Sequence, residues 1–565
     1  MDYQVQELLP PGTVALEDCE SGAGCCGQWA ALTATVQRNE IILQPTPSDD
    51  PEQPLNWSVG RKTVNYVIVC FYALITFTLP NYSTSRIRRS PLLTFPRLDW
   101  RLNEELGISY NDMNNSFAAN VAGLAIGCIF MIPLAVKFGR RPVYIASTAI
   151  QLAACIWSAR TYTTGDLIGS NVVSGVGGAI SESIVQMTIA DLFFVHQRAR
   201  MNSAYLVMVY TGTFLAPVAA GYCAKAQGWR WIWWWTLIFI AVSLVITIVA
   251  YEETKYTSRT DSMRTRSHDS YDQHDLPTKV DENSKTPLES TTVQTHDTSF
   301  ASASPKRSWK QRYALITRTP GGSRPFLHLV WDTVTLVRFP AVAYTALMWG
   351  ATLMWFSVVL TTMSTYFTLP PYNFSPIGIG LMNLPPFIGT LLGLVVSSSN
   401  DWIILKLSKR NRGIFEPEMR LWLALLGAII TPAGVLLFGL SMTNGMPWII
   451  PCIGNAMFGF GSAVNGGASL TYLQDCYAEV IGDALVSVTF VRNGLAAVVV
   501  FALTPWINSL GLYNTFVCAS VLAWAVYLLT LPMLIWGRKW RVLTAASYRQ
   551  HLARSGKHAP GTTAS

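Results

Sequence analysis

Residues 231–250 read WIWWWTLIFIAVSLVITIVA, a run without a single charged side chain. An α-helix needs about 20 predominantly apolar residues to cross the hydrocarbon core of a bilayer. The run opens with a cluster of tryptophans, a residue type that is enriched where a membrane meets water. We therefore predict that this stretch is a membrane-spanning helix.

Comparable apolar stretches recur along the chain from Thr63 onward, in two groups separated by a long polar segment. In order they cover residues 63–80, 113–136, 142–160, 166–190, 203–223, 231–250, 340–368, 376–397, 420–441, 447–472, 484–505 and 513–536. The sequence thus predicts an all-α membrane protein with twelve transmembrane helices in two six-helix bundles.

The composition supports this fold class. Of the 565 residues, 50% are apolar and 13% are charged, whereas soluble proteins are about 25% charged. The net charge of +8 comes from Lys and Arg that gather beside the apolar stretches, so it does not indicate nucleic-acid binding. None of the seven His falls inside a predicted span, and we expect neither a metal site nor a cofactor.

The polar segments divide the chain. We expect a cytoplasmic N-terminal tail over residues 1–60 without a cleaved signal peptide, and six-helix bundles over 61–251 and 339–537. Residues 252–338 hold 13 Lys or Arg and 11 Asp or Glu, which predicts a mostly disordered cytoplasmic linker. Residues 538–565 are expected to form a cytoplasmic C-terminal tail.

The basic residues of the short loops indicate the orientation, because such residues favour the cytoplasmic side. With the N-terminus inside, the cytoplasmic loops and tail would hold Lys137, Arg140, Arg141, Arg198, Arg200, Lys406, Lys409, Arg410, Arg412, Arg420, Arg538, Lys539 and Arg541. Both termini would then be cytoplasmic. The N-glycosylation sequons at Asn81 and Asn373 would face the exterior.

The first outer loop departs from this charge pattern, because residues 85–100 are basic and carry two prolines. This stretch is either an unusual basic external loop or an insertion of the kind that a mis-spliced gene model would produce. The sequence leaves both readings open.

Two cytoplasmic motifs indicate a family. Residues 132–141 read IPLAVKFGRR, which resembles the loop motif G-x-x-x-D-R-x-G-R-R of the major facilitator superfamily. Ile132 and Val136 replace the leading Gly and the Asp of that motif. Residues 191–200, DLFFVHQRAR, resemble the family's interhelical loop, in which acid and base pair to hold the inward-closed state. The resemblance implies a cytoplasmic gate made of Lys137, Gly139, Arg140, Arg141, Asp191 and Arg198; anchoring by positive charge and a solvated loop are the alternatives.

A motif in the fifth predicted span points to antiport. Residues 212–221, GTFLAPVAAG, resemble the family motif G-x-x-x-G-P-x-x-G-G through Gly212, Pro217 and Gly221, and this motif is associated with exporters. Residues 50–58 (DPEQPLNWS) and 410–421 (RNRGIFEPEMRL) are similar to the fungal twelve-spanner drug:proton antiporter group. The resemblance implies the family's fold and secondary transport of a small molecule.

Two charged residues lie well inside predicted spans rather than at their ends, where an unpaired charge is costly and marks a functional candidate. Glu182 lies in the fourth span, roughly 12 Å from its cytoplasmic end at about 1.5 Å per residue. In the family an Arg of the fourth span is tied to proton coupling, but Asn171 stands at that position here, so we propose Glu182 as the proton-exchanging group. The alternative is a structural Glu182 that is hydrogen-bonded to Ser181 or to a neighbouring helix. Arg492 lies at a similar depth in the eleventh span; it could contact substrate or pair with an acid such as Asp483.

Further polar and aromatic residues within the spans are candidates for the substrate cavity. Amides in a bilayer usually face other helices, and aromatic rings can stack on a planar or cationic ligand, although helix and lipid packing explains them as well. These candidates are Asn120, Asn455, Asn465, Trp349, Trp355 and Tyr366.

The leading functional hypothesis is proton-coupled efflux of a drug-like compound or fungal secondary metabolite by alternating access. Proton-coupled uptake of a small cation or polyamine is one alternative, and a non-transporting nutrient sensor on the same fold is another. An ATP-binding Gly-x-x-x-x-Gly-Lys motif and the hydrolase motifs are lacking, so an enzyme is not expected. The expected partners are substrate, protons and lipid, without nucleic acid, for a monomer in the plasma membrane or the vacuolar membrane.

Overall fold

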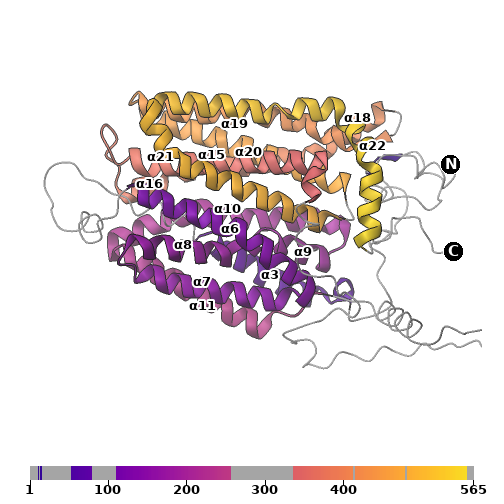
Figure 1. Ribbon diagram of the computed structural model, residues 1–565, viewed down its shortest axis with the longest axis horizontal. Helices are drawn as coiled ribbons and strands as arrows, with labels where there is room; N and C mark the ends of the chain where they lie inside the picture. The colour runs from indigo at the N-terminus through magenta and orange to yellow at the C-terminus, as the bar shows by residue number, and fades with distance from the viewer. Residues whose placement is uncertain are drawn as a thin grey trace, which may run out of the picture.

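The computed structural model describes residue 11 and residues 13–15, 53–78, 110–255, 335–411, 414–477 and 480–555. The described chain forms two bundles of long helices that lie side by side with their axes roughly parallel (Figure 1). Among these residues, nine helical stretches are long and apolar enough to cross a membrane. The predicted all-α membrane fold is confirmed.

The first bundle, here called the N-half, starts with the short 3-10 helix η3 (Pro54–Asn56). Its long helices follow in sequence order and are counted here as crossings from α3 onward. The fourth crossing consists of two α-helices joined by a 3-10 turn. They are α3 (Val59–Thr76), α6 (Tyr110–Phe138), α7 (Arg140–Ala159), α8 (Thr164–Gly178) with η5 (Ala179–Ser181) and α9 (Ile184–Leu192), α10 (Val195–Gln227) and α11 (Trp229–Ala250).

The second bundle, the C-half, begins after η6 (Leu336–Arg338). Its helices are α15 (Pro340–Tyr366), α16 (Pro376–Leu381), α17 (Leu384–Ser398), α18 (Asn400–Arg410), α19 (Leu421–Thr443), α20 (Ile449–Cys476), α21 (Ile481–Tyr527) and α22 (Thr530–Ser555). The strand β2 (Ile414–Phe415) and the 3-10 helix η7 (Pro417–Arg420) lie between α18 and α19. The strand β1 (Val14–Ala15) pairs antiparallel with β2.

The helices agree with the predicted spans except at a few places. The eleventh and twelfth spans are both part of α21, which turns at Gly511 with φ of +77°, a backbone angle that glycine adopts without strain. The eighth span extends through α18 to Arg410, and α22 continues to Ser555, well past the predicted end at 536. Most of the predicted linker and the first outer loop, including residues 81 and 85–100, lie outside the described residues.

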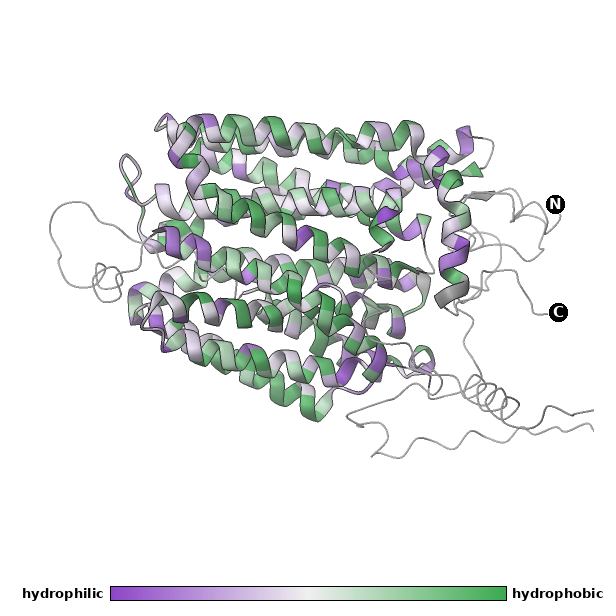
Figure 2. Cartoon of the chain, in the orientation of Figure 1, coloured by the Kyte–Doolittle hydropathy of each residue, from purple (hydrophilic) through white to green (hydrophobic). Residues whose placement is uncertain are grey.

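Hydrophobic residues predominate along most of the length of both bundles, and hydrophilic residues gather toward the ends (Figure 2). The tail end is defined here as the end at which α3 begins and at which β1, β2 and η7 lie. Figure 1 shows part of α22 turning across this end of the C-half. The other end, where α6 begins and α10 ends, is called the opposite end.

Candidate functional site

The candidate site is built around an ion pair that joins the two bundles. Glu182 lies between η5 and α9 in the N-half, and Arg492 lies on α21 in the C-half. The guanidinium of Arg492 forms an ion pair with the carboxylate of Glu182, and the side chains are only 9% and 10% exposed, respectively. The sequence suggests Asp483, an acid of the same half, as a partner for Arg492. In the structure, Arg492 pairs instead with Glu182 of the other half.

The fourth crossing of the N-half is interrupted next to Glu182, because Gly177 and Gly178 end α8 and a 3-10 turn follows. Hydroxyl groups of nearby side chains donate hydrogen bonds to backbone carbonyl oxygens at this break. The Ser147 hydroxyl donates to Gly177 (2.5 Å), the Ser181 hydroxyl to Gly178 (2.8 Å) and the Tyr205 hydroxyl to the carbonyl oxygen of Ser181 (2.8 Å). The carbonyl oxygens of Gly177, Gly178 and Ser181 therefore have hydrogen-bond partners although the helix is interrupted, and Glu182 directly follows this break.

Arg492 has further partners besides Glu182. Its Nη2 and Nε donate to Asn493 Oδ1 at 3.1 and 3.3 Å. Its guanidinium carbon lies 5.7 Å from the ring centre of Trp349 on α15, and Trp349 Nε1 donates to the Gly466 carbonyl oxygen at 3.1 Å. The structure thus brings together three of the residues chosen from sequence, namely Glu182, Arg492 and Trp349.

A second polar contact joins the halves beside the ion pair. The hydroxyl groups of Ser183 and Thr489 lie 3.1 Å apart, one residue after Glu182 and three before Arg492. A methyl group added at Gly482 on α21 would lie 3.3 Å from Met187 on α9. The tail-side halves of the fourth and eleventh crossings are therefore in contact in this structure.

The other cavity candidates make contacts within their own half. Asn120 Nδ2 donates to the Asn171 carbonyl oxygen (3.0 Å), and Asn455 Nδ2 donates to the Met382 carbonyl oxygen (3.4 Å). Asn465 Nδ2 donates to the Thr431 hydroxyl at 3.2 Å. The side chain of Trp355 is buried, and that of Tyr366 is partly buried. The three amides therefore join neighbouring helices, as amides in a membrane commonly do.

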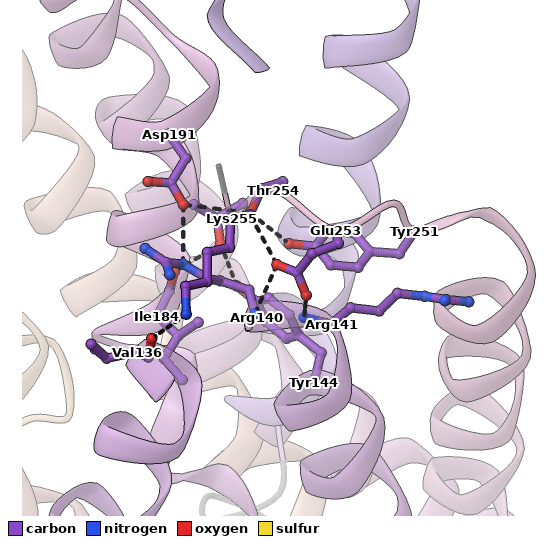
Figure 3. Close-up of polar contacts among 11 residues, drawn as sticks. Val136, Arg140, Arg141, Tyr144, Ile184, Asp191, Tyr251, Glu253, Thr254 and Lys255 are labelled. Atoms are coloured by element: carbon purple, nitrogen blue, oxygen red, sulfur yellow. Dashed lines mark hydrogen bonds and ion pairs between the residues drawn. The ribbon is translucent and has the colours of Figure 1, made fainter. Parts of the chain in front are cut away.

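The predicted gate motif forms a charge cluster at the tail end of the N-half (Figure 3). Arg140 Nε lies 3.1 Å from the Asp191 carboxylate, which joins the start of α7 to the end of α9. The carboxylate of Glu253 accepts hydrogen bonds from the backbone N–H groups of Arg140 and Arg141, at 2.9 and 3.0 Å. Because these N–H groups begin α7, Glu253 caps this helix. Gly139 (φ +108°) leaves room for the carboxylate, with which a Cβ would collide.

The segment after α11 also binds the end of α6. Lys255 Nζ donates to the carbonyl oxygens of Val136 (2.6 Å) and Lys137 (3.0 Å) (Figure 3). Lys137 itself lies near the ring of Phe138, 5.8 Å from its centre. Position 136, where the family motif has Asp, thus contributes its backbone oxygen. The side chain of Arg198 lies outside the described part of the chain.

A similar cluster closes the tail end of the C-half. Arg420 at the end of η7 pairs with Asp475 near the end of α20, in the same arrangement as Arg140 and Asp191. Arg541 on α22 binds Glu418 through two hydrogen bonds of 2.6 and 2.8 Å. The sequence alone does not single out the partners in these two clusters, which are Glu253, Lys255, Asp475, Glu418 and Arg541. A comparison of the two halves would have found Asp475, since each half has an Arg after its second crossing and an Asp at the end of its fourth.

The antiporter-like motif on α10 joins the halves near the opposite end. A Cβ on Gly221 would lie 2.6 Å from the Pro376 carbonyl oxygen, and a Cβ on Gly380 would lie 2.8 Å from that of Pro217. Gly212 instead faces Leu74 of its own half. Also near this end, Asn114 Nδ2 donates to the Thr504 hydroxyl at 3.0 Å across the halves. Small residues thus let α10 approach α16 closely.

Of the two sequons, Asn81 lies outside the described residues. Asn373 is exposed between α15 and α16 with φ of +49°, and the hydroxyl of Ser375 in the same sequon accepts the Gly378 N–H at 3.3 Å. Among the described residues, no group of three or more His, Cys, Asp or Glu is placed to hold a metal ion.

Comparison with known proteins agrees with this architecture. The family model of the Major Facilitator Superfamily matches residues 67–501. An uncharacterised MFS-type transporter of Schizosaccharomyces pombe is 32% identical, over 97% of this chain and 95% of the relative. The MFS antiporter QDR3 of Candida albicans is 23% identical, over 84% of this chain and 77% of the relative.

A solved structure shares the fold. The partially occluded inward-open conformation of the xylose transporter XylE from E. coli matches with a TM-score of 0.53 at 14% identity, over 82% of this chain and 97% of that one. Since the family model spans most of the chain and the S. pombe relative is similar along nearly all of it, this protein is a multi-pass membrane protein of the major facilitator superfamily, a family of transporters for small molecules.

Proposed function

We propose that this transporter exports a small organic molecule in exchange for protons, and that Glu182 carries the proton. The observation that supports the proposal most is the buried ion pair between Glu182 and Arg492, because it links the charge of one carboxylate to the contact between the halves. A proton on Glu182 would remove that attraction and leave the Arg492 charge without its partner. Breaking a buried ion pair in this way costs about 3–5 kcal/mol.

This cost couples protonation to movement. While the tail-side contact is closed, a neutral Glu182 leaves a buried charge on Arg492, so protonation favours separation of the halves and hydration of Arg492. When the proton leaves on the tail side, the ion pair can form again and close that side. A carrier that must return through this step takes up a proton on one side of the membrane and releases it on the other.

Export is the direction favoured by the motif on α10 and by the relative that is named an antiporter. In the proposed cycle, substrate enters from the tail side while Glu182 is ionised. The halves close at the tail side and open at the opposite end, where substrate leaves and the next proton enters. The substrate would be a drug-like compound or a secondary metabolite.

The proposal includes the arrangement in the cell. Both tails and the linker over residues 252–338 would lie in the cytoplasm, with bundles over 61–251 and 339–537, and the membrane would be the plasma membrane. The protein would act as a monomer and carry an N-linked glycan at Asn81 or Asn373.

Uptake of a small cation is the second candidate. The carboxylate of Glu182 and the ring of Trp349 both lie beside the Arg492 guanidinium, and such groups would also suit an organic cation. The direction of transport separates the two candidates.

The experiment compares metabolites inside and outside cells that carry or lack the gene. For an exporter, the cargo accumulates inside the deletion strain and falls in the medium. If the affected compound instead falls inside the deletion strain, the protein is an importer. If the compound shows no transport by purified protein in liposomes, the proposal of a transport function for that cargo is wrong and a sensory role is favoured.

A further inference from the structure

A segment from the N-terminal part of the chain lies at the tail end of the C-half. Strand β1 precedes the first helix of the N-half, yet it pairs with β2 of the C-half, with Val14 opposite Phe415 and Ala15 opposite Ile414. We call residue 11 and residues 13–15 the N-terminal clasp. In this way a segment that precedes the N-half in the sequence is bound to the C-half.

The clasp completes the hydrogen bonds of a buried arginine. The side chain of Arg541 on α22 is only 1% exposed. Its Nε and Nη2 donate to Glu418, and its remaining nitrogen, Nη1, donates to the Pro11 carbonyl oxygen and to the Thr13 hydroxyl (3.2 Å). Without the clasp, one nitrogen of a buried cation would lack these acceptors, and such an unsatisfied charged group is costly.

Arg541 in turn connects to the charge cluster of the C-half. Its partner Glu418 lies on η7, the same short helix that carries Arg420 and its partner Asp475. In the equivalent cluster of the N-half, Glu253 and Lys255 come from the segment that directly follows its last crossing, α11. Among the contacts of the described residues, the cluster of the C-half thus includes acceptors from residues 11 and 13, which lie 530 and 528 positions before Arg541 in the sequence.

We propose that the clasp is a permanently docked peptide ligand of the C-half that holds Arg541 and Glu418 in place and thereby stabilises the tail-end cluster. Recognition combines strand addition at the edge of β2 with acceptors for a buried guanidinium. All of its described partners lie in the C-half, so the clasp moves with that half when the two bundles separate. The role is independent of cargo and of proton coupling.

Cross-linking tests the docking. The variant Ala15→Cys/Ile414→Cys places thiols on facing residues of an antiparallel pair, whose Cα atoms lie about 4.5–5.5 Å apart, within the range of a disulfide. Oxidation of native membranes should join the two positions, as identified in the digested protein by mass spectrometry. The control Ala15→Cys/Trp402→Cys uses an exposed residue on α18 and should not cross-link. Absence of the Ala15–Ile414 link, or equal linking of the control, would overturn the docking.

Hydrogen exchange tests the role of the clasp in the full chain. The variant Val14→Pro/Ala15→Pro removes the backbone donors of β1, and we expect exchange in residues 414–420 and 541–548 to become about tenfold faster, as loss of a hydrogen bond to a charged group implies. Residues 136–141 and 251–255, the equivalent cluster of the N-half, should keep their rates. A synthetic peptide of residues 8–18 should restore protection, and the same peptide with both prolines should not. Unchanged exchange, or equal loosening of both clusters, would contradict the proposal.

Discussion

At the scale of single residues, the central feature is the ion pair that Glu182 of one half forms with Arg492 of the other. Each would be costly in a membrane alone, and each is about nine-tenths buried. Together they form a contact between the halves, and in the proposed mechanism one proton on Glu182 weakens it. This is why we assign proton exchange to Glu182 although Asn171 replaces the Arg that the family has in the same crossing.

The pair should show strong coupling in a double-mutant cycle. Glu182→Gln or Arg492→Gln alone leaves one charge buried without its partner, and each should destabilise the protein by about 3–5 kcal/mol. The double variant should lose less than the sum, since neither charge remains. Thermal unfolding of the purified variants in detergent measures this, and additive losses would mean that the two side chains do not interact.

Both members of the pair were predictable from the sequence, but their contact was not. An ionised residue in an apolar run is visible in the sequence, whereas the pairing of Glu182 with Arg492 requires the two bundles to be placed in space. The same limit applies to Glu253, because the start of α7, which it caps, is formed by a different part of the chain. Asn120, Asn455 and Asn465 looked equally suitable as cavity residues, and only their contacts reveal that they join helices within one half.

At the scale of elements, most helices were predictable because an apolar run of about 20 residues has one stable form in lipid. The interruption of the fourth crossing was not predicted, since Gly177 and Gly178 also fit a continuous, closely packed helix. The apolar pattern also gave no sign of the clasp, whose two-residue strand is too short to show a period. Helix boundaries at the tail end differ because α18 and α22 continue beyond the apolar residues.

The contact between α10 and α16 should be sensitive to size. Gly221→Val would push a branched side chain against the Pro376 carbonyl, so the opposite end should close less well and the transport rate should fall several-fold. Gly60→Ala on α3 is the matched control, because a Cβ there would meet no atom within 4 Å. A Gly221→Val protein that transports like the control would show that this contact is not needed.

The tail-end cluster of the N-half should respond to pH through Lys255. Burial first, and then Arg140, lower the pKa of Lys255 from 10.5 to about 8, although Glu253 and Asp191 oppose the shift. Between the folded and unfolded pKa values, the unfolded chain holds more protons, so the free energy of unfolding should rise as pH rises from about 8 toward 10. Below that window both states are protonated and the burial penalty is present in full.

The measurement is the melting temperature of the wild-type protein minus that of Lys255→Met, taken from pH 7 to pH 9.5. This difference should increase with pH, because the variant has no ammonium group to neutralise. Parallel melting curves for the two proteins would refute the assignment to Lys255.

At the scale of the whole molecule, the two halves are in contact both near the opposite end and on the tail side. Asn114 with Thr504 and α10 with α16 join them near the opposite end, while Glu182, Ser183, Arg492 and Thr489 join them on the tail side. Alternating access requires these two sets of contacts to open in turn. The six-plus-six arrangement was predictable from the sequence, but the residues that meet between the halves were not.

Cross-linking the opposite end should stop transport. In Asn114→Cys/Thr504→Cys, the two thiols stand on residues of different halves whose side chains form a hydrogen bond of 3.0 Å, so a disulfide between them should hold that end closed. Transport of the compound identified by metabolite profiling should cease on oxidation and recover on reduction. The link between Ala15→Cys and Ile414→Cys lies within one half and should leave transport intact. Unimpeded transport by the oxidised Asn114/Thr504 variant would contradict alternating access.

The most direct test of proton-coupled exchange uses purified protein in liposomes with an imposed pH difference. We predict that the wild-type protein moves protons opposite to the identified compound and that Glu182→Asp keeps this exchange. Glu182→Gln should lose both the proton movement and the dependence of flux on the pH difference. Proton-coupled flux that is the same in Glu182→Gln as in the wild-type protein would contradict the role of Glu182 and the mechanism built on it.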